Sequence, residues 1–230
     1  MVKTFVQGLV FIVVAGILAL FVYWQADVVH RGGPLMVPIV MCSIFAMAIT
    51  LERSVYFLRL PDTHAFLGQL RGLVLRQAWQ EAEALCAQTA GPVARVVKSG
   101  VVAHALQPEE IDRVMTDAAH EELPHIESHH RWLSTIAQVS TLLGLLGTVV
   151  GMVLAFQVIQ HKATSANPVS PGDLAGGIWQ ALITTVGGLV VAIPTVLAYG
   201  YLSNRSAEVQ YQMERSAGIV ANWRHLKDLK

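Results

Sequence analysis

The chain has 230 residues, of which 53% are hydrophobic and only 14% charged, and its formal net charge at pH 7 is zero. One soluble core could hardly bury so much apolar surface, so we do not expect a soluble enzyme. The neutral balance, with basic residues scattered rather than grouped with aromatic ones, argues against a nucleic-acid partner.

Four segments contain no Asp, Glu, Lys or Arg over a length that can span a bilayer: residues 4–26, 32–51, 132–160 and 174–204. A bilayer core needs roughly 20 helical residues. The sequence therefore predicts an all-α integral membrane protein with four transmembrane helices and a lipid bilayer around them. The first segment could instead be a secretory signal, but bulky residues stand where a cleavage site needs small ones, so we expect it to be retained.

The orientation of the spans follows from the distribution of Lys and Arg. These residues concentrate between residues 52 and 131 and after residue 204, whereas the two other connections hold only Arg31 and Lys162. Because cytoplasmic flanks retain positive charge, both termini are expected in the cytoplasm. The predicted parts are a first helix with a short periplasmic link (1–31), a second transmembrane helix (32–60), a cytoplasmic helical domain (61–131), a transmembrane hairpin with a periplasmic loop at 161–173 (132–204), and a cytoplasmic C-terminal helix (205–230).

The cytoplasmic segment is predicted to be helical and divided by helix breakers. Asp62 can cap a helix whose apolar residues recur at helical spacing, and Gly91-Pro92 ends that run before another helix begins. Pro108 suits a first helical turn. From there the pattern predicts one long helix that continues through Arg131 into the third span, with a kink at Pro124.

Four histidines in this segment raise the question of a metal site. His125 and His129 have a spacing that could hold a metal ion on one helical face, with His120 and His130 close by in the sequence. A solvated polar helix would show the same pattern, and no recognised ligand motif is present, so no metal site is predicted. The chain also lacks a phosphate loop, a nucleophile elbow and any cofactor motif, so neither a catalytic residue nor a cofactor is expected.

The third and fourth spans each carry polar and small residues at helical spacing. Lipid penalises polar atoms without partners by several kcal/mol, so these rows should face protein or water. Glycines permit close approach of helices, and a proline bends a span. The polar candidates are Thr141, Thr148, Gln180, Thr184 and Thr185, and the candidates for helix packing are Gly144, Gly147, Gly151, Gly187, Gly188 and Pro194.

Residues 141–152 (TLLGLLGTVVGM), 177–185 (GIWQALITT) and 191–194 (VAIP) together resemble the MotA/TolQ/ExbB proton-channel family. The resemblance covers nearly everything after residue 31, and the VAIP ending with a single long cytoplasmic insertion is most similar to ExbB. Thr148 and Thr185 match the family's pore threonines. Gln180 stands where ExbB and TolQ proteins usually have a glutamate, and Thr141 where many relatives have proline.

This resemblance implies a homopentamer in the bacterial inner membrane, with the third and fourth spans around a central pore. It implies a single-span, ExbD-like partner that supplies an intramembrane aspartate, and a TonB-like protein energised by the proton motive force for outer-membrane import. A TolQ-like or MotA-like output stays open. A different class is open too, because polar rows can be mere interhelical glue in a non-conducting membrane scaffold.

Overall fold

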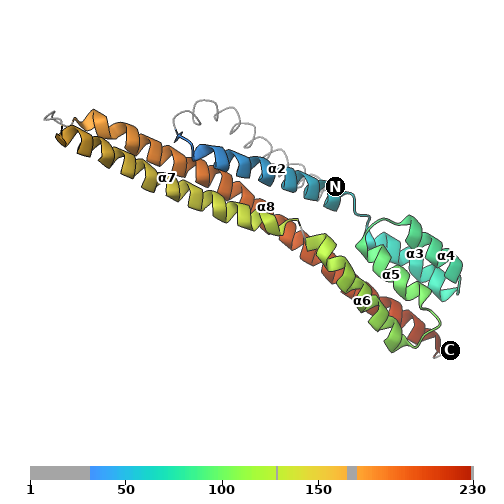
Figure 1. Ribbon diagram of the computed structural model, residues 1–230. Coiled ribbons are helices and arrows are strands. Elements are labelled where there is room, and N and C mark those ends of the chain that lie inside the picture. The colour runs from blue at the N-terminus through green and yellow to red at the C-terminus, as the bar shows by residue number, and fades with distance from the viewer. Residues whose placement is uncertain (1–31, 128, 165–169, 229–230) are drawn as a thin grey trace. The chain divides into compact units, whose positions relative to one another are not determined.

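The computed structural model describes residues 32–127, 129–164 and 170–228, and within these ranges every regular element is a helix (Figure 1). Its first predicted span, residues 4–26, lies outside the described residues. Among those described, three helical stretches are long and apolar enough to cross a membrane. The helices are α2 (Met36–Leu58), α3 (Thr63–Leu75), α4 (Trp79–Gln88), α5 (Pro92–Val102), α6 (Pro108–Glu127), α7 (Arg131–Thr164) and α8 (Pro171–Asp228).

The chain divides into two compact units. One comprises Met1–Leu51 and Arg131–Gly200, and we call it the apolar unit. The other comprises Glu52–His130 and Tyr201–Lys230, and we call it the polar unit. Helices α2 and α8 each contribute residues to both units.

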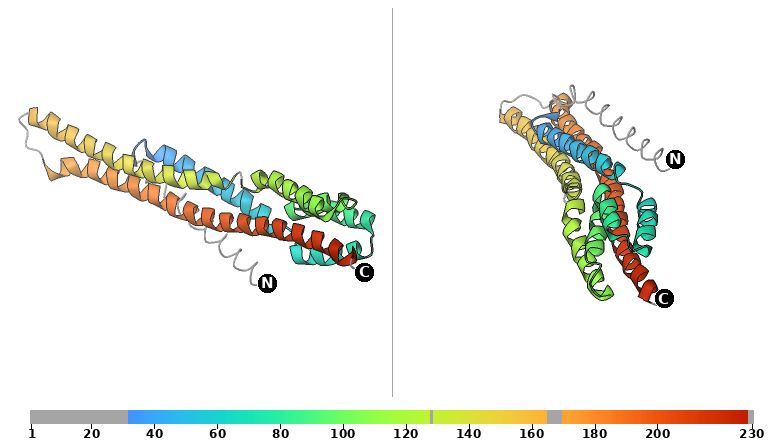
Figure 2. Two further views of the ribbon diagram at one scale, coloured as in Figure 1. Left: turned by 90° about the horizontal axis from the view of Figure 1, so that it is seen from below. Right: turned by 90° about the vertical axis from the view of Figure 1, so that its right-hand side faces the viewer.

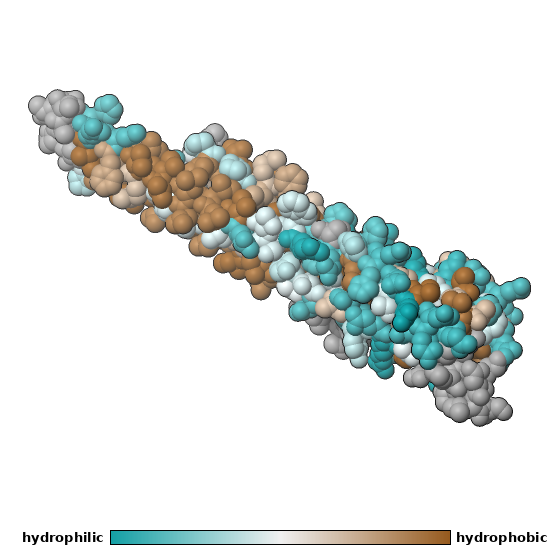
Figure 3. All heavy atoms as spheres, turned by 60° about the horizontal axis from the view of Figure 1, so that its bottom comes forward, coloured by the Kyte–Doolittle hydropathy of each residue, from teal (hydrophilic) through white to brown (hydrophobic). Residues whose placement is uncertain are grey.

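In the apolar unit, α7 and the first part of α8 lie side by side, with α2 against them (Figure 2). A small core of Met36, Ile39 and Val191 joins α2 to α8. Large apolar side chains cover the outside, and Figure 3 shows this surface as a nearly continuous brown area. A patch of this extent fits acyl chains rather than water. The protein is therefore a membrane protein. The large apolar side chains exposed on this surface include Val37, Ile44, Leu142, Phe156, Leu182 and Leu197.

The polar unit has a conventional hydrophobic core. Met115 of α6 is fully buried and its side chain occupies the space beside Gly100 of α5, where a Cβ would overlap its sulfur. Arg95 of α5 holds Glu122 of α6 with two hydrogen bonds of 2.5 Å, from Nε to Oε1 and from Nη2 to Oε2. The other fully or nearly fully buried members of this core include Leu70, Val96, Val97, Val101, Ile126 and Met213.

The local signals at two helix starts are confirmed. Asp62 is the N-cap of α3, and its side chain accepts a hydrogen bond of 3.0 Å from the backbone N of His64. Gly91 precedes α5 with a φ of 121°, and Pro92 occupies its first turn. The expectation of one continuous helix from Asp62 to Gly91 is wrong, because α3 and α4 are separate helices. The chain turns at Gln77, which has a φ of 59°, and Ala78 N closes the turn on the Leu73 carbonyl at 3.0 Å.

The expected continuous helix from Pro108 into the third span is also wrong. Helix α6 continues through Pro124 but ends at Glu127, and α7 begins at Arg131. The end of α6 has a partner from far upstream. Arg53, which is only 5% exposed, donates a hydrogen bond of 3.1 Å to the carbonyl of His125, and so satisfies one of the carbonyls that a helix end leaves free.

The buried thiol of Cys86 in α4 yields a first prediction. Burial raises its pKa from 9.0 to about 11, an effect that Lys98 opposes and Glu83 reinforces. At pH 8 the thiolate population is then about 100-fold lower than for a free cysteine. In a Cys42→Ser background we expect maleimide to label the folded protein at least that much more slowly than the denatured protein. Equal labelling rates in the two states would contradict the assignment.

The same shift makes stability depend on pH. The folded state binds the Cys86 proton more tightly than the unfolded state, so the stabilisation is complete below pH 9 and is lost as the pH rises toward 11. The loss is at most about 3 kcal/mol. Thermal unfolding at pH 8 and pH 10.5 should therefore show a smaller drop in Tm for Cys86→Ala than for the wild type.

Candidate functional site

The site is built on the contact between α7 and α8, where the two backbones touch. A Cβ added to Gly144 of α7 would lie 3.3 Å from the Cα atoms of Gly188 and Thr185 of α8. A Cβ added to Gly188 would lie 2.6 Å from the Ser140 carbonyl oxygen. Because neither helix has a side chain here, their peptide groups can approach to distances that membrane helices reach only at small residues.

This contact continues along both helices. A Cβ at Gly147 would overlap the side chain of Thr184, and a Cβ at Gly151 would lie 2.7 Å from Ala181 Cβ and from the Gly177 carbonyl oxygen. Gly177 was not among the predicted packing residues. Its signal was present, since Gly177 and Ala181 are small residues four positions apart and continue the row of Gly188 toward the start of α8.

Thr185 links the two helices through a hydrogen bond. Its hydroxyl Oγ1 lies 2.9 Å from the Gly144 carbonyl oxygen of α7 and 3.4 Å from the Ala181 carbonyl of its own helix. The shorter, interhelical bond is the favoured one by geometry. Thr185 therefore ties α8 to α7 at the point of closest backbone approach.

Gln180 and Thr184 lie on the side of α8 that meets the start of α2. Thr184 is 1% exposed, and its Oγ1 lies 2.5 Å from the Gln180 carbonyl and 3.3 Å from the Gly32 carbonyl. The amide of Gln180 covers Gly33, where a Cβ would overlap its Nε2. Gly33 has a φ of 73°, so both its conformation and its neighbour require glycine.

Thr148 and Thr141 make their hydrogen bonds within α7. Thr148 Oγ1 donates to the Leu145 carbonyl at 2.6 Å, and Thr141 Oγ1 donates to the Ala137 carbonyl at 3.0 Å. Thr141 is exposed and Thr148 is half-buried. Each hydroxyl oxygen can still accept a hydrogen bond, from water or from a protonated group. The predicted polar set thus falls into three groups. Thr185 bonds to α7; Gln180 and Thr184 contact Gly33 and Gly32 before α2, and the Thr184 side chain also lies against Gly147 of α7; Thr148 and Thr141 bond within α7.

The remaining predicted residues are placed as follows. Gly187 faces α2, where a Cβ would lie 3.0 Å from Met36 Cε. Pro194 is half-buried, and α8 runs through it without interruption. A polar residue that the prediction missed is Ser140, which is completely buried on α7 and whose Oγ has no hydrogen-bond partner among the described residues. Helical spacing could have found it, because Ser140 lies four positions before Gly144.

The polar chemistry available in the spans of the apolar unit is mainly that of hydroxyls and amides, and Gln180 is the amide of the candidate site. No Asp, Glu, Lys or Arg occurs at positions 32–51, 132–160 or 174–204. Gln180 and the threonines donate and accept hydrogen bonds, but none of them takes up or releases a proton near neutral pH. These side chains can order water or solvate a charged group, whereas proton storage needs a titratable group from elsewhere.

Two histidines of the polar unit, His125 and His129, lie at the end of α6 and contact Arg53. Arg53 donates to the Nδ1 of His129 as well as to the His125 carbonyl. Within the part of the chain that the structure describes, no three side chains of His, Cys, Asp or Glu converge as a metal site would require.

A double-mutant cycle tests the contact between Gln180 and Gly33. Gly33→Ala alone should destabilise the protein by more than the roughly 1 kcal/mol that a positive φ costs a non-glycine residue, because the new methyl overlaps the Gln180 amide. In the Gln180→Ala background the overlap disappears, and only the backbone cost remains. Thermal unfolding in detergent should therefore show a smaller loss of Tm there. Additive effects would mean that the two residues do not touch.

Residues 88–215 match the model of the MotA/TolQ/ExbB proton channel family. The chain is 33% identical over 167 residues to the putative biopolymer transport protein ExbB-like 3 of Synechocystis sp., an alignment that covers 72% of this chain and 79% of that protein.

Two shorter or weaker similarities point the same way. A putative ExbB homolog of Methanothermobacter thermautotrophicus is 26% identical over 181 residues, covering 78% of this chain and 63% of that protein. The Tol-Pal system protein TolQ of Haemophilus influenzae is 40% identical over 94 residues, covering 40% of this chain and 39% of that protein. The stretch shared with the family model includes α7 and the part of α8 that carries Gln180, Thr184 and Thr185.

Proposed function

The chain belongs to the MotA/TolQ/ExbB proton-channel family, and from this premise we propose that it is the pore subunit of an ExbB–ExbD-like motor in the bacterial inner membrane. Five copies would surround a central pore, with both termini in the cytoplasm. The motor would use the proton motive force to energise a TonB-like protein for import across the outer membrane. The protein itself would act without enzymatic chemistry and without a cofactor.

One observation carries this proposal: residues 32–51, 132–160 and 174–204 contain hydroxyls and amides but no Asp, Glu, His, Lys or Arg. A site that holds a proton on its way across the membrane needs a titratable group, and because these spans offer no carboxylate the natural source is a partner. The aspartate of an ExbD-like single-span subunit would supply it. Thr148 and Thr185 would then solvate the carboxylate as it alternates between its charged and neutral forms.

The available energy fits such a motor. One elementary charge that crosses 100 mV releases about 2.3 kcal/mol. A few protons could therefore shift a helix between two packings of similar stability. The contact of α7 with α8 at Gly144 and Gly188 is made of bare backbone, and so has few interlocking side chains to resist such a shift.

Two other functions have specific support. Similarity to a TolQ protein favours a role in the envelope in place of import, by the same proton-driven mechanism. A MotA-like stator, which the family description includes, would be a variant of this first alternative. The second is a non-conducting scaffold, because the hydroxyls of Thr184 and Thr185 already have partners within one protomer, as interhelical glue would.

The deciding experiment is the mass and composition of the complex after co-expression with a single-span protein that carries an intramembrane aspartate. Extraction in mild detergent should give five copies of this chain with fewer copies of the partner. Replacement of the partner's aspartate with asparagine should leave this complex intact and abolish proton uptake into vesicles. A homo-oligomer that excludes every such partner would overturn the motor and favour the scaffold.

A further inference from the structure

A groove in the polar unit lies between α3 and the C-terminal part of α8. It has a volume of about 270 Å³. At one end Thr63 of α3 donates a hydrogen bond of 2.7 Å to Oε1 of Gln212 of α8, which fixes the two helices relative to each other. The groove is therefore a built feature of this unit, formed by residues from two elements.

The titratable residues that line the groove are two arginines and one histidine. Arg71 comes from α3 and Arg215 from α8, with His64 beside them, and no Asp or Glu contributes to the lining. Neither arginine forms an ion pair with any residue that the structure describes. Two unpaired guanidinium groups on facing helices generate a positive potential that no local carboxylate cancels.

Carboxylates near the groove are engaged elsewhere. Asp62 caps the first turn of α3 by accepting from the backbone N of His64. Glu208, one turn before Gln212 on α8, forms an ion pair with Arg205. Neither carboxylate lines the groove, so the charged side chains that face its opening are the two arginines.

The groove is open at Gly68 of α3. His64, Gly68 and Arg71 occupy one face of α3, at spacings of four and three residues. A Cβ at Gly68 would meet no heavy atom within 4 Å, so this position leaves the groove open. Across from it, Arg215 and Ile219 lie on one face of α8.

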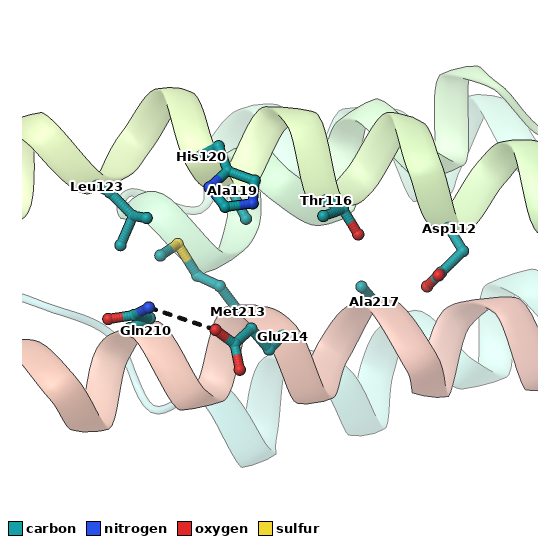
Figure 4. Close-up of a pocket in the computed structure, with 9 residues that line it drawn as sticks. All are labelled: Asp112, Thr116, Ala119, His120, Leu123, Gln210, Met213, Glu214 and Ala217. Carbon is teal, nitrogen blue, oxygen red and sulfur yellow. Dashed lines mark hydrogen bonds between the residues drawn. The ribbon is translucent and has the colours of Figure 1, made fainter.

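A second groove of the same unit has acidic residues in its lining, so acidic and basic side chains line different grooves. It lies between α6 and α8, has a volume of about 290 Å³ and is lined by Asp112 and Glu214 together with His120 (Figure 4). The adjacent residues Glu214 and Arg215 thus point into different grooves, one acidic and one basic. The positive groove is a distinct site and not part of a uniformly mixed surface.

We propose that the groove between α3 and α8 binds a phosphate-bearing anion. Guanidinium groups match phosphate oxygens with paired hydrogen bonds, and two arginines on opposite walls can hold one phosphate from both sides. The phosphate belongs either to a soluble compound or to a phospholipid headgroup. This site is independent of the proton pathway.

The soluble source is tested with the full chain in nanodiscs of neutral lipid. Inorganic pyrophosphate is titrated calorimetrically against chloride at matched ionic strength. Arg71→Gln and Arg215→Gln should each weaken pyrophosphate binding at least about tenfold. Arg113→Gln, which removes an exposed charge of α6 outside the groove, should leave it unchanged.

Two glycine substitutions test whether filling the groove blocks binding when both arginine charges are kept. Gly68→Leu places a side chain in the opening and should abolish binding, whereas Gly72→Leu adds the same side chain to the same helix at a position outside the groove lining and should leave binding intact. Both substitutions favour the helix, so unfolding does not confuse the comparison.

The headgroup source is tested by native mass spectrometry of the protein after mild extraction. An anionic phospholipid that is retained by the wild type and by Gly72→Leu, but lost from Arg71→Gln, Arg215→Gln and Gly68→Leu, identifies that source. The proposal is overturned if pyrophosphate binds no more tightly than chloride and no phospholipid is lost from these variants. Equal losses in Arg113→Gln and Gly72→Leu would overturn it as well.

Discussion

Gly188→Leu is expected to prevent α7 and α8 from packing and to abolish the assembled protein. Its Cβ would lie 2.6 Å from the Ser140 carbonyl oxygen and 3.0 Å from Gly144 Cα. Both are backbone atoms, so no side chain can rotate away and the helices must separate. Overpacking against movable side chains already costs about 1–3 kcal/mol, and a clash with backbone should cost more. Separation would also stretch the hydrogen bond from Thr185 to the Gly144 carbonyl.

The matched control is Gly176→Leu on the same helix. A Cβ at Gly176 would meet no heavy atom within 4 Å, so the added leucine is tolerated within the protomer. Thermal unfolding and size-exclusion chromatography in detergent measure the effect. Gly188→Leu should lose the cooperative transition and the oligomer peak, Gly188→Ala should be intermediate, and Gly176→Leu should resemble the wild type. An unchanged Tm for Gly188→Leu would show that the helices do not meet there.

Features that depend on length or on local chemistry could be predicted from the sequence. A span must be roughly 20 uncharged residues long whatever surrounds it, and all three such segments that the structure describes are helical. Asp62 and Gly91-Pro92 act on their own helix ends, so their effect needs no knowledge of the fold. These rules are local, and the sequence around each residue contains all that they require.

Features that depend on distant partners could not be predicted. The end of α6 is stabilised by Arg53, which is 72 residues away from His125 in the chain, and no local signal marks that break. The turn between α3 and α4 uses Gln77 at positive φ, a conformation for which glutamine carries no preference. Periodicity alone could not have revealed either feature.

The candidate site shows the same division between local spacing and distant contact. Helical spacing separates Thr184 from Thr185 by about 100° around α8, so it predicts that the two hydroxyls point in different directions. It cannot say which helix each one meets. The structure places Thr184 against the carbonyl of Gly32, 152 residues away, and Thr185 against that of Gly144, 41 residues away.

Thr148→Val and Thr185→Val are both expected to abolish proton-driven activity while the complex still assembles. Valine keeps the shape of threonine and replaces only the hydroxyl, which is the group that would solvate the partner's carboxylate. Proton uptake into vesicles that contain the chain and its single-span partner, followed with a pH-sensitive dye, measures the activity. Thr135→Val, on the exposed surface of α7, is the matched control and should retain full uptake.

The thermal stability of the two valine variants distinguishes a role of the hydroxyls in proton transfer from a role in helix packing. Thr185→Val removes a hydrogen bond between two helices and should lower the Tm by an amount that corresponds to about 1 kcal/mol. Thr148→Val removes a bond within α7 only, so its Tm should hardly change. If the hydroxyls act on protons, both variants lose uptake although only one loses stability, and Thr185→Ser recovers uptake. If they act as glue, the loss of uptake follows the loss of Tm and Thr148→Val stays active. Full uptake in both valine variants would exclude the two hydroxyls from the proton pathway.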